Sequence, residues 1–137
     1  MKYAFLDSSV ILRVILNEPH QLKEFKQVEK GFCSQIAKLE CLRTLDRLHF
    51  SIRANEKEIL SWREIFYEIY AKLTVIPVTA QVIDLASQPL GFSLKSLDAI
   101  HLITCQLLQR SVTQMPMFTH DTKLAAAVKS IGIKVFG

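Results

Sequence analysis

Residues 3–16 read YAFLDSSVILRVIL, a short apolar run, then an acidic residue and two serines, then a second apolar run. The first run, residues 3–6, has the length and composition of a buried strand. The second, residues 10–16, follows side chains that begin helices, because Asp and Ser accept hydrogen bonds from free backbone N–H groups. The stretch therefore predicts a strand that passes directly into a helix, with Asp7 at the junction.

The same alternation of short apolar runs and longer helical segments continues along the chain. Short strands separated by helices predict a parallel sheet covered on both faces. We expect an α/β fold, a three-layer α/β/α sandwich around a mainly parallel sheet of about five strands. The sequence has no repeats, low-complexity tracts or internal boundary, so residues 1–137 are expected to form a single domain. The expected strands span 2–6, 32–34, 74–78, 116–119 and 133–136, and the expected helices 10–16, 35–50, 55–72, 79–88, 94–110 and 122–130.

Composition argues against several classes of protein. Hydrophobic residues make up 50% of the chain and charged residues 22%, a balance that argues against disorder. No apolar stretch approaches the roughly 18 residues of a membrane span, and an acidic residue occurs too early for a signal-peptide core. We therefore expect a cytoplasmic protein with no membrane partner. The three cysteines lack C-x-x-C spacing and are expected to be reduced core residues.

Four acidic residues stand where a charge contributes least to solubility. Asp7 and Asp121 each follow an expected strand, whereas Glu40 and Asp98 lie within largely apolar helical segments. In open parallel sheets, sites form beyond the carboxyl ends of the strands, and all four positions map to that edge. Carboxylates gathered in a partly dry cleft repel one another unless a cation lies between them. The four acids therefore predict a site for a hard divalent cation with oxygen ligands.

Each of these acids also has an ordinary structural explanation. Asp7 and Asp121 can act as N-caps of the helices that follow them. Asp98 can complement the positive end of its helix dipole, and Glu40 can pair with Arg43 or Thr44 along its helix. A shared site is favoured because all four positions map to one rim of the expected sheet.

The net charge of +4, from 17 basic and 13 acidic residues, hides a larger basic excess. Without the four acids, 17 basic and nine acidic residues remain, an excess of +8. Such a surface favours polyanions, because bound phosphates release condensed counterions. The basic residues are scattered, however, so the charge also fits an ordinary soluble surface. The side chains considered as contacts for flanking phosphates are Arg13, Lys38, Arg43, Arg47, Lys95 and Lys123.

The motifs around the four acids resemble those of PIN domains, especially the VapC-type toxin ribonucleases. FLDSSVIL at residues 5–12, with Glu-Pro at 18–19, resembles the opening of the family. SQIAKLE at residues 34–40 resembles its second acidic position, and LDAIH at residues 97–101 its D-A-x-H helix. FTHD at residues 118–121, followed by KLAAA, resembles its T-x-D ending. The matches are in order and span nearly the whole chain.

This resemblance implies a five-stranded parallel sandwich and an endoribonuclease that depends on Mg²⁺ or Mn²⁺. It also implies the toxin of a type II toxin–antitoxin pair, which forms a homodimer, cleaves RNA and is neutralised by a small antitoxin protein. The implied catalytic and metal-binding residues are Asp7, Glu40, Asp98 and Asp121, which bind the metal directly or through water. Of these, we expect Asp7 and Asp98 to be direct ligands and Glu40 and Asp121 to act through water. Ser8 and Thr119 would orient the carboxylates, and His101 would support the site or be an ordinary core histidine.

Phosphodiester cleavage needs an activated water and neutralisation of the charge that develops on the phosphate. One or two divalent cations held by carboxylates can supply both. The alternatives are a PIN-fold binding or scaffold module without cleavage, which would lack one or more acids, and a stand-alone nuclease with no antitoxin. A phospho-acceptor receiver domain needs a late Lys after a strand, and a haloacid-dehalogenase-type phosphatase needs Asp-x-Asp. No Lys follows an expected strand at the required place, and Asp7 is followed by two serines instead of the Asp-x-Asp motif.

Overall fold

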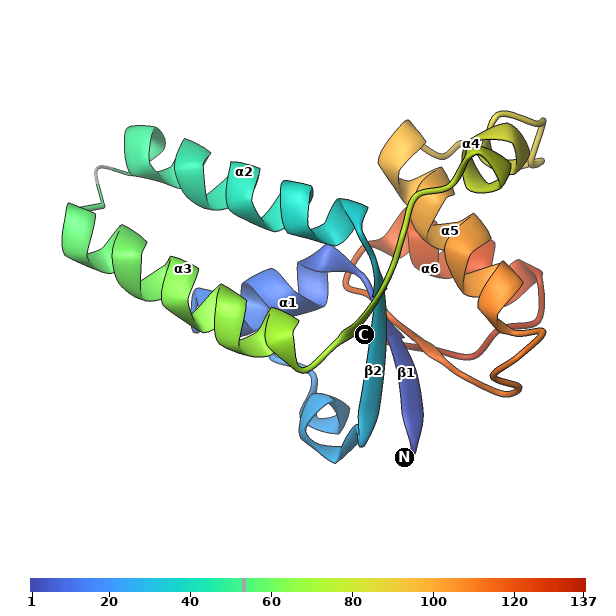
Figure 1. The fold of residues 1–137 in the computed structure, drawn as a ribbon, viewed down its shortest axis with the longest axis horizontal. Helices are drawn as coiled ribbons and strands as arrows, with labels where there is room; N and C mark the ends of the chain where they lie inside the picture. The colour runs from blue at the N-terminus through green and yellow to red at the C-terminus, as the bar shows by residue number, and fades with distance from the viewer. Residues whose placement is uncertain (53) are drawn as a thin grey trace.

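The computed structural model describes residues 1–52 and 54–137, and these form one sheet of five parallel strands (Figure 1). The strands are β1 (Tyr3–Leu6), β2 (Lys30–Ser34), β3 (Thr74–Ile76), β4 (Met117–Phe118) and β5 (Val135–Phe136). They lie in the order β3-β2-β1-β4-β5, and each neighbouring pair is parallel. The chain therefore builds outward from β1 in one direction and later crosses to the other side of β1.

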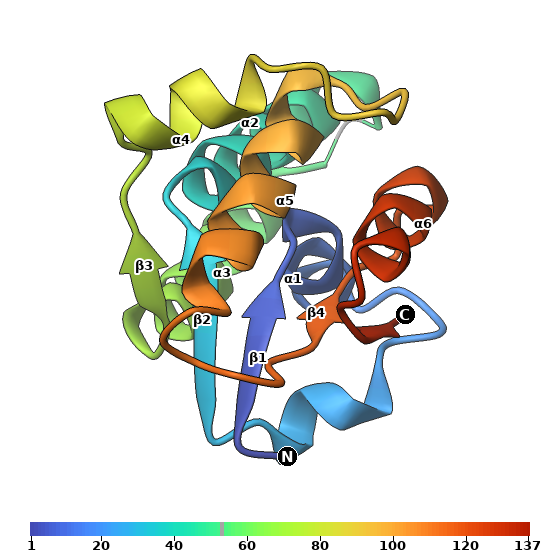
Figure 2. The same ribbon diagram turned by 90° about the vertical axis from the view of Figure 1, so that its right-hand side faces the viewer.

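Helices connect the strands throughout the described part of the chain. The α-helices are α1 (Ser8–Ile15), α2 (Ile36–Ser51), α3 (Glu56–Ala71), α4 (Ala80–Ala86), α5 (Ser96–Leu108) and α6 (Thr122–Ser130), and a 3-10 helix, η1, spans Lys23–Gln27. In Figure 1, α1, α2 and α3 lie to the left of the strands and α4, α5 and α6 to the right. Figure 2, turned by 90°, brings α5 and α6 toward the viewer.

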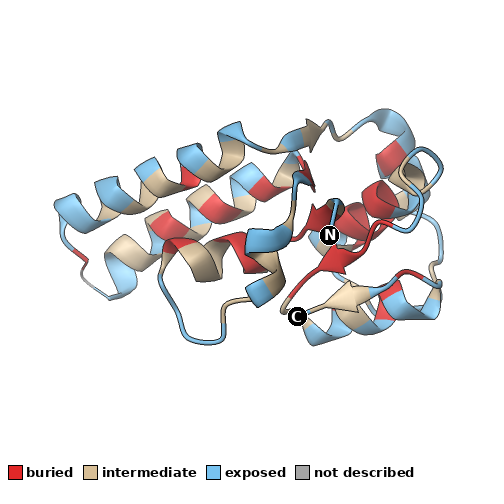
Figure 3. Cartoon of the chain, turned by 90° about the horizontal axis from the view of Figure 1, so that it is seen from below, coloured by how far each residue is buried: buried red, intermediate tan, exposed pale blue. Residues whose placement is uncertain are grey.

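Alternating side chains of β1 place the two groups of helices on opposite faces of the sheet. Ala4 and Leu6 belong to a buried cluster that includes side chains of α1, α2 and α3, whereas Phe5 belongs to a second cluster with side chains of α5 and α6. Successive side chains of a strand point to opposite faces, so the clusters are the two interfaces of a three-layer α/β/α sandwich. Figure 3 shows the buried residues gathered on the strands and on the helix faces toward them. The expected fold class is confirmed.

The pair α2 and α3 extends beyond the sheet (Figure 1). Asn55 begins α3 with a capping box: its side chain accepts a hydrogen bond of 2.8 Å from the Glu58 backbone N–H, and the Glu58 side chain accepts one of 3.5 Å from the Asn55 N–H. This reciprocal arrangement satisfies two backbone donors that a helix start leaves free. The expected start of the helix at Asn55 is confirmed.

Some element boundaries differ from those expected. β2 begins at Lys30, two residues before the expected strand start, and includes Gly31. A Cβ added at Gly31 would lie 2.6 Å from Cδ2 of Leu73, so a side chain there would have to displace the end of the Leu73 side chain. β3 ends at Ile76, one residue before Pro77, which has no N–H to donate to a ladder. The first helix begins two residues earlier than expected, at the first serine after β1.

The cysteines Cys33, Cys41 and Cys105 are buried free thiols within the two main clusters, which confirms the expectation of reduced core residues. Burial raises the pKa of the Cys33 and Cys105 thiols to about 12, which keeps them protonated at neutral pH. Among residues 1–52 and 54–137, the structure contains no helix with both the length and the apolar character of a membrane span.

The strand order reverses at β1, which pairs with β2 on one side and with β4 on the other. In open α/β sheets such a reversal leaves a crevice outside the carboxyl ends of the two strands. The Asp7 N–H donates to the carbonyl of Phe118 at the end of β4, which holds the two strand ends side by side. The residues that follow β1 and β4 therefore meet at the crevice.

Candidate metal centre

Asp7 lies at the centre of this crevice and is 3% exposed. It occupies the N-cap position of α1, but its side chain makes no capping hydrogen bond. Instead, Oδ2 accepts hydrogen bonds from Ser9 Oγ at 2.7 Å and from Thr119 Oγ1 at 2.8 Å. Oδ1 faces Nε2 of His101 at 3.4 Å. The carboxylate is therefore held by one oxygen and presents the other to the side chains of α2 and α5.

A small hydroxyl network fixes Asp7 between α1 and the segment after β4. Thr119 Oγ1, besides donating to Asp7, accepts a hydrogen bond of 3.0 Å from the Asp121 N–H. Ser9 Oγ accepts one of 2.9 Å from the His120 N–H. Each hydroxyl thus donates a hydrogen bond to the carboxylate and accepts one from a backbone N–H. The two hydroxyls lie 3.5 Å apart.

Ser9 was not among the expected site residues, since the resemblance implied the orienting role for Ser8. The Ser8 hydroxyl lies 3.5 Å from Asp7 Oδ1, a weak contact beside the 2.7 Å bond from Ser9. The sequence signal for both is the same, because two serines follow the acid. In the first turn of α1, the side chain of Ser9 lies on the side toward Thr119, and Ser9 is therefore the serine that orients Asp7.

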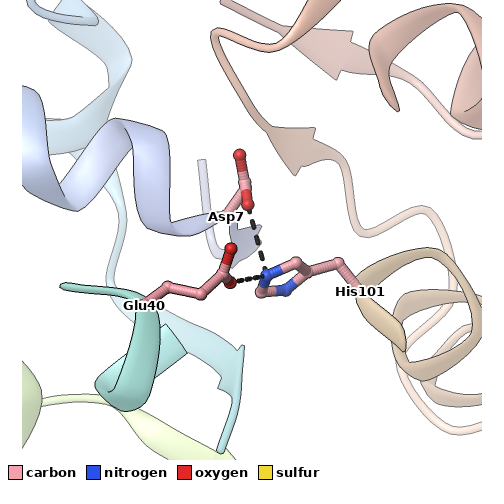
Figure 4. Close-up of side chains that lie close together, drawn as sticks. All are labelled: Asp7, Glu40 and His101. Atoms are coloured by element: carbon pink, nitrogen blue, oxygen red, sulfur yellow. Dashed lines mark hydrogen bonds and ion pairs between the residues drawn. The ribbon is translucent and has the colours of Figure 1, made fainter. Parts of the chain in front are cut away.

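Glu40 and His101 reach Asp7 from α2 and α5 (Figure 4). Nε2 of His101 is hydrogen-bonded to Oε1 of Glu40 and faces Asp7 Oδ1. One ligand atom from each of the three residues lies within 4.8 Å of the other two. His101 is fully buried. Because it contacts two of the acids directly, it is more than a packing residue of the core. Arg43, one of the ordinary partners considered for Glu40, instead pairs with Asp46 at 2.9 Å.

The charges around His101 oppose the effect of its burial. Burial alone would lower its pKa, but the hydrogen bond with Glu40 and the charge of Asp7 raise the pKa above the ordinary value. Its other ring nitrogen, Nδ1, is buried without a hydrogen-bond partner in the described residues. The ring therefore has one interacting edge, and that edge is turned toward the acids.

Asp98 and Asp121 lie beside this group, on the wall of an open pocket of about 420 Å³. Asp98 is in the first turn of α5, and His101 follows it by three residues, so both share one side of the helix. Asp121 does cap α6, because its Oδ1 accepts a hydrogen bond of 2.8 Å from the Leu124 N–H. The ordinary explanation thus applies to Asp121, although its position still places a carboxylate on the pocket wall.

The pKa of Asp98 shows that the four acids share one electrostatic field. Partial burial, followed by the charges of Asp121, Asp7 and Glu40, raises the pKa of Asp98 from 3.8 to about 6, against the opposing charge of His101. Like charges this close destabilise one another unless a cation is bound. Carboxylate oxygens are the protein ligands that suit Mg²⁺ or Mn²⁺, and these four acids supply them. Asp7 and Asp98 could hold such an ion directly and Glu40 and Asp121 through water, while Nε2 of His101 stays engaged with Glu40 and Asp7.

Comparisons with known proteins show the family to which this chain belongs. The family model described as PIN domain matches residues 4–130. Ribonuclease VapC46 of Mycobacterium tuberculosis (strain ATCC 25618 / H37Rv) is 30% identical over 139 residues, covering 98% of this chain and 97% of that protein.

Solved structures share the fold at lower identity. A toxin–antitoxin complex from Klebsiella pneumoniae matches with a TM-score of 0.65 and 18% identity, over 98% of this chain and 96% of that one. PAE2754 from Pyrobaculum aerophilum matches with a TM-score of 0.66 and 17% identity, over 98% and 83%. VapBC2 from Rickettsia felis, bound to a DNA fragment from its promoter, matches with a TM-score of 0.63 and 14% identity, over 99% and 98%. The family match and the full-length relative together show that this chain is a VapC-type member of the PIN domain family.

Proposed function

We propose that this protein is an endoribonuclease that hydrolyses RNA phosphodiester bonds with the help of Mg²⁺ or Mn²⁺. The observation that carries the proposal is the position of Asp7, a buried carboxylate oriented by Ser9 and Thr119 at the point where the strand order reverses. Its free oxygen faces His101, which also contacts Glu40. The relative with matching length is named a ribonuclease, which supports the same activity here.

The proposed mechanism divides the four acids into two pairs. Asp7 and Asp98 would hold the cation directly, and Glu40 and Asp121 would act through water, as Mg²⁺ usually keeps several of its waters. A bound divalent cation supplies positive charge against the negative charge that develops on the scissile phosphate. The hydroxyl network keeps Oδ2 of Asp7 occupied, so Oδ1 is the oxygen left for the site.

His101 keeps Glu40 near Asp7 in this mechanism. Its hydrogen bond to Glu40 Oε1 leaves the second oxygen of that carboxylate to orient an attacking water. The Glu40 side chain is 19% exposed and His101 is fully buried, so water reaches the former and not the latter. With its position fixed by His101, Glu40 would hold the reacting water in line with the leaving oxygen.

We further propose that the protein is the toxin of a type II toxin–antitoxin pair and forms a homodimer. The solved structures with the same fold include a toxin–antitoxin complex and VapBC2, which supports an antitoxin partner. A short reading frame beside the gene, whose product co-purifies with this chain and inhibits it, is the expected result. An active protein with no such neighbour would instead be a stand-alone nuclease.

The activity is tested by incubating the purified protein with RNA and either Mg²⁺ or Mn²⁺, in parallel with EDTA. Cleavage that requires the cation, and that is lost in Asp98→Asn, supports the proposal. Asp84→Asn provides a matched control, because Asp84 is an exposed acid on α4 outside the site. Calorimetry that detects no binding of either cation at millimolar concentration would favour a binding module without cleavage.

A further inference from the structure

Two open pockets adjoin the candidate metal centre, one on each side. The pocket of about 420 Å³ described above contains Asp98 and Asp121 and is also lined by Lys95 and Lys123. A second pocket of about 410 Å³ runs along α2. Its lining residues are Leu39, Glu40, Arg43, Thr44, Arg47 and, from the start of α5, Leu97. Each pocket thus combines at least one acid of the centre with two cationic side chains, and the consecutive residues Leu97 and Asp98 line one pocket each.

The two arginines of the α2 pocket follow Glu40 along one face of the helix. Arg43 and Arg47 lie three and seven residues after Glu40, which places them about 4.5 and about 10 Å further along the axis. Arg43 is paired with Asp46, but both side chains are well exposed, so this ion pair is weak and a phosphate can replace it. Arg47 bonds to the Thr44 hydroxyl at 3.4 Å and has no acidic partner in the described residues.

The two lysines of the other pocket stand at helix starts, where a positive charge opposes the helix dipole. Lys95 is the N-cap residue of α5, and its side chain makes no capping hydrogen bond. Lys123 is in the first turn of α6. Backbone N–H groups at these starts add further positive potential toward the same pocket. Both lysines are exposed, so their ammonium groups can contact a phosphate that enters the pocket.

We infer that single-stranded RNA crosses the candidate metal centre, with Arg43 and Arg47 binding its phosphates on one side and Lys95 and Lys123 on the other. This inference rests on the proposed nuclease function and names the path of its substrate. The scissile phosphate must reach Asp7, which is 3% exposed. A flexible single strand can bend into such a site, whereas the phosphates of a duplex follow a regular helix.

The structure separates these four residues from the other basic candidates. Arg13 lies 3.9 Å from Glu18 and donates to the His20 carbonyl, so its guanidinium is engaged in the loop after α1. Lys38 lies over the ring of Tyr67, with its Nζ 5.9 Å from the ring centroid. Neither residue lines the two pockets that contain the acids.

The test measures binding of a labelled single-stranded oligoribonucleotide over a range of salt concentrations, in an Asp98→Asn background that does not cut it. Arg47→Ala and Lys123→Ala are each expected to weaken binding about tenfold. Each is also expected to reduce the slope of log affinity against log salt by about 0.7, and the double variant by about 1.4. Arg110→Ala, at the opposite end of α5, and Lys129→Ala, at the opposite end of α6, are matched controls with unchanged slope.

The outcomes distinguish this inference from the proposed function. If the wild-type protein cuts RNA but Arg47→Ala and Lys123→Ala behave like their controls in affinity and slope, the path is wrong and the function stands. If RNA is bound with slopes that depend on these residues but is never cut, the path stands and the function fails. Duplex RNA bound as tightly as the single strand would overturn the single-stranded part of the inference.

Discussion

Thr119 donates a hydrogen bond of 2.8 Å to the carboxylate of Asp7, although 112 positions separate the two residues in the sequence. The bond joins the ends of β4 and β1, which are neighbours in the sheet at the point where the strand order reverses. The same hydroxyl accepts from the Asp121 N–H. One buried side chain therefore fixes both an acid of the centre and the start of the segment that carries another.

Replacing Thr119 with Val should destabilise the fold, because Val keeps the shape but removes the hydroxyl. Asp7 Oδ2 would lose a donor and the Asp121 N–H an acceptor in a buried setting. We expect a loss of about 1–3 kcal/mol in the free energy of unfolding, measured by urea denaturation. Thr119→Ser keeps the hydroxyl and should lose less. Equal stability of the Val variant and the wild type would show that this bond contributes nothing.

Ser9→Ala should weaken Mn²⁺ binding more than Ser8→Ala. The Ser9 hydroxyl donates to Asp7 at 2.7 Å, whereas that of Ser8 lies at 3.5 Å. Residues that orient a metal ligand typically contribute about 10- to 100-fold in affinity, so we expect about a tenfold loss for Ser9→Ala in isothermal titration calorimetry. The reverse ranking of the two serine variants would refute the assignment of Ser9 as the orienting residue.

Asp98→Asn should stabilise the metal-free protein at neutral pH. The pKa of Asp98 is raised from 3.8 to about 6, so the folded state binds more protons than the unfolded state between these pH values. The ionisation of Asp98 therefore lowers the free energy of unfolding as pH rises from 3.8 to about 6, and the free energy stays lowered above pH 6. After allowance for solvent screening we expect Asp98→Asn to gain on the order of 1 kcal/mol in EDTA at pH 7.

Added Mg²⁺ or Mn²⁺ should reverse that ranking, because the cation stabilises the wild-type carboxylate and not the amide. Thermal unfolding with and without the cation measures both effects. Asp84→Asn, a change of the same kind at an exposed position, should behave like the wild type in both conditions. An effect of Asp98→Asn that is the same with and without cation would contradict a metal role for this acid.

His101→Gln should change how the stability of the metal-free protein depends on pH. The pKa of His101 is raised above its ordinary 6.5 by Glu40 and Asp7, despite burial. Its stabilising contribution is therefore fully present below pH 6.5 and is lost as pH rises through the folded value. We expect the wild type in EDTA to lose stability over that interval, and His101→Gln to show a flatter profile. If the stability of His101→Gln depends on pH in the same way as that of the wild type, His101 does not titrate in contact with the acids.

The sequence predicted the parts of this structure that local chemistry determines. The alternation of strands and helices, the helix start at Asn55 and the placement of acids after β1 and β4 all follow from short patterns. It did not separate Ser9 from Ser8, because that depends on how the first turn of α1 meets the segment after β4. It also could not show that the ring of His101 would lie between Glu40 and Asp7, since three separate elements set that contact.

The basic residues illustrate the same limit. Arg13 and Arg47 are alike in sequence, each on a helix that follows a strand. The loop after α1 engages Arg13 with Glu18, whereas Arg47 lines a pocket that also contains Glu40. Which arginine faces the acids is a property of tertiary packing.

The central claim is that the centre around Asp7 cleaves RNA, and the most direct measurement is the hydrolysis rate of one defined oligoribonucleotide with Mn²⁺. Asp7→Asn preserves size and should lower the rate at least about a hundredfold, as removal of a single charge-stabilising group typically does. Asp84→Asn, made and purified in the same way, should retain the wild-type rate. Hydrolysis by Asp7→Asn at the wild-type rate would contradict the account.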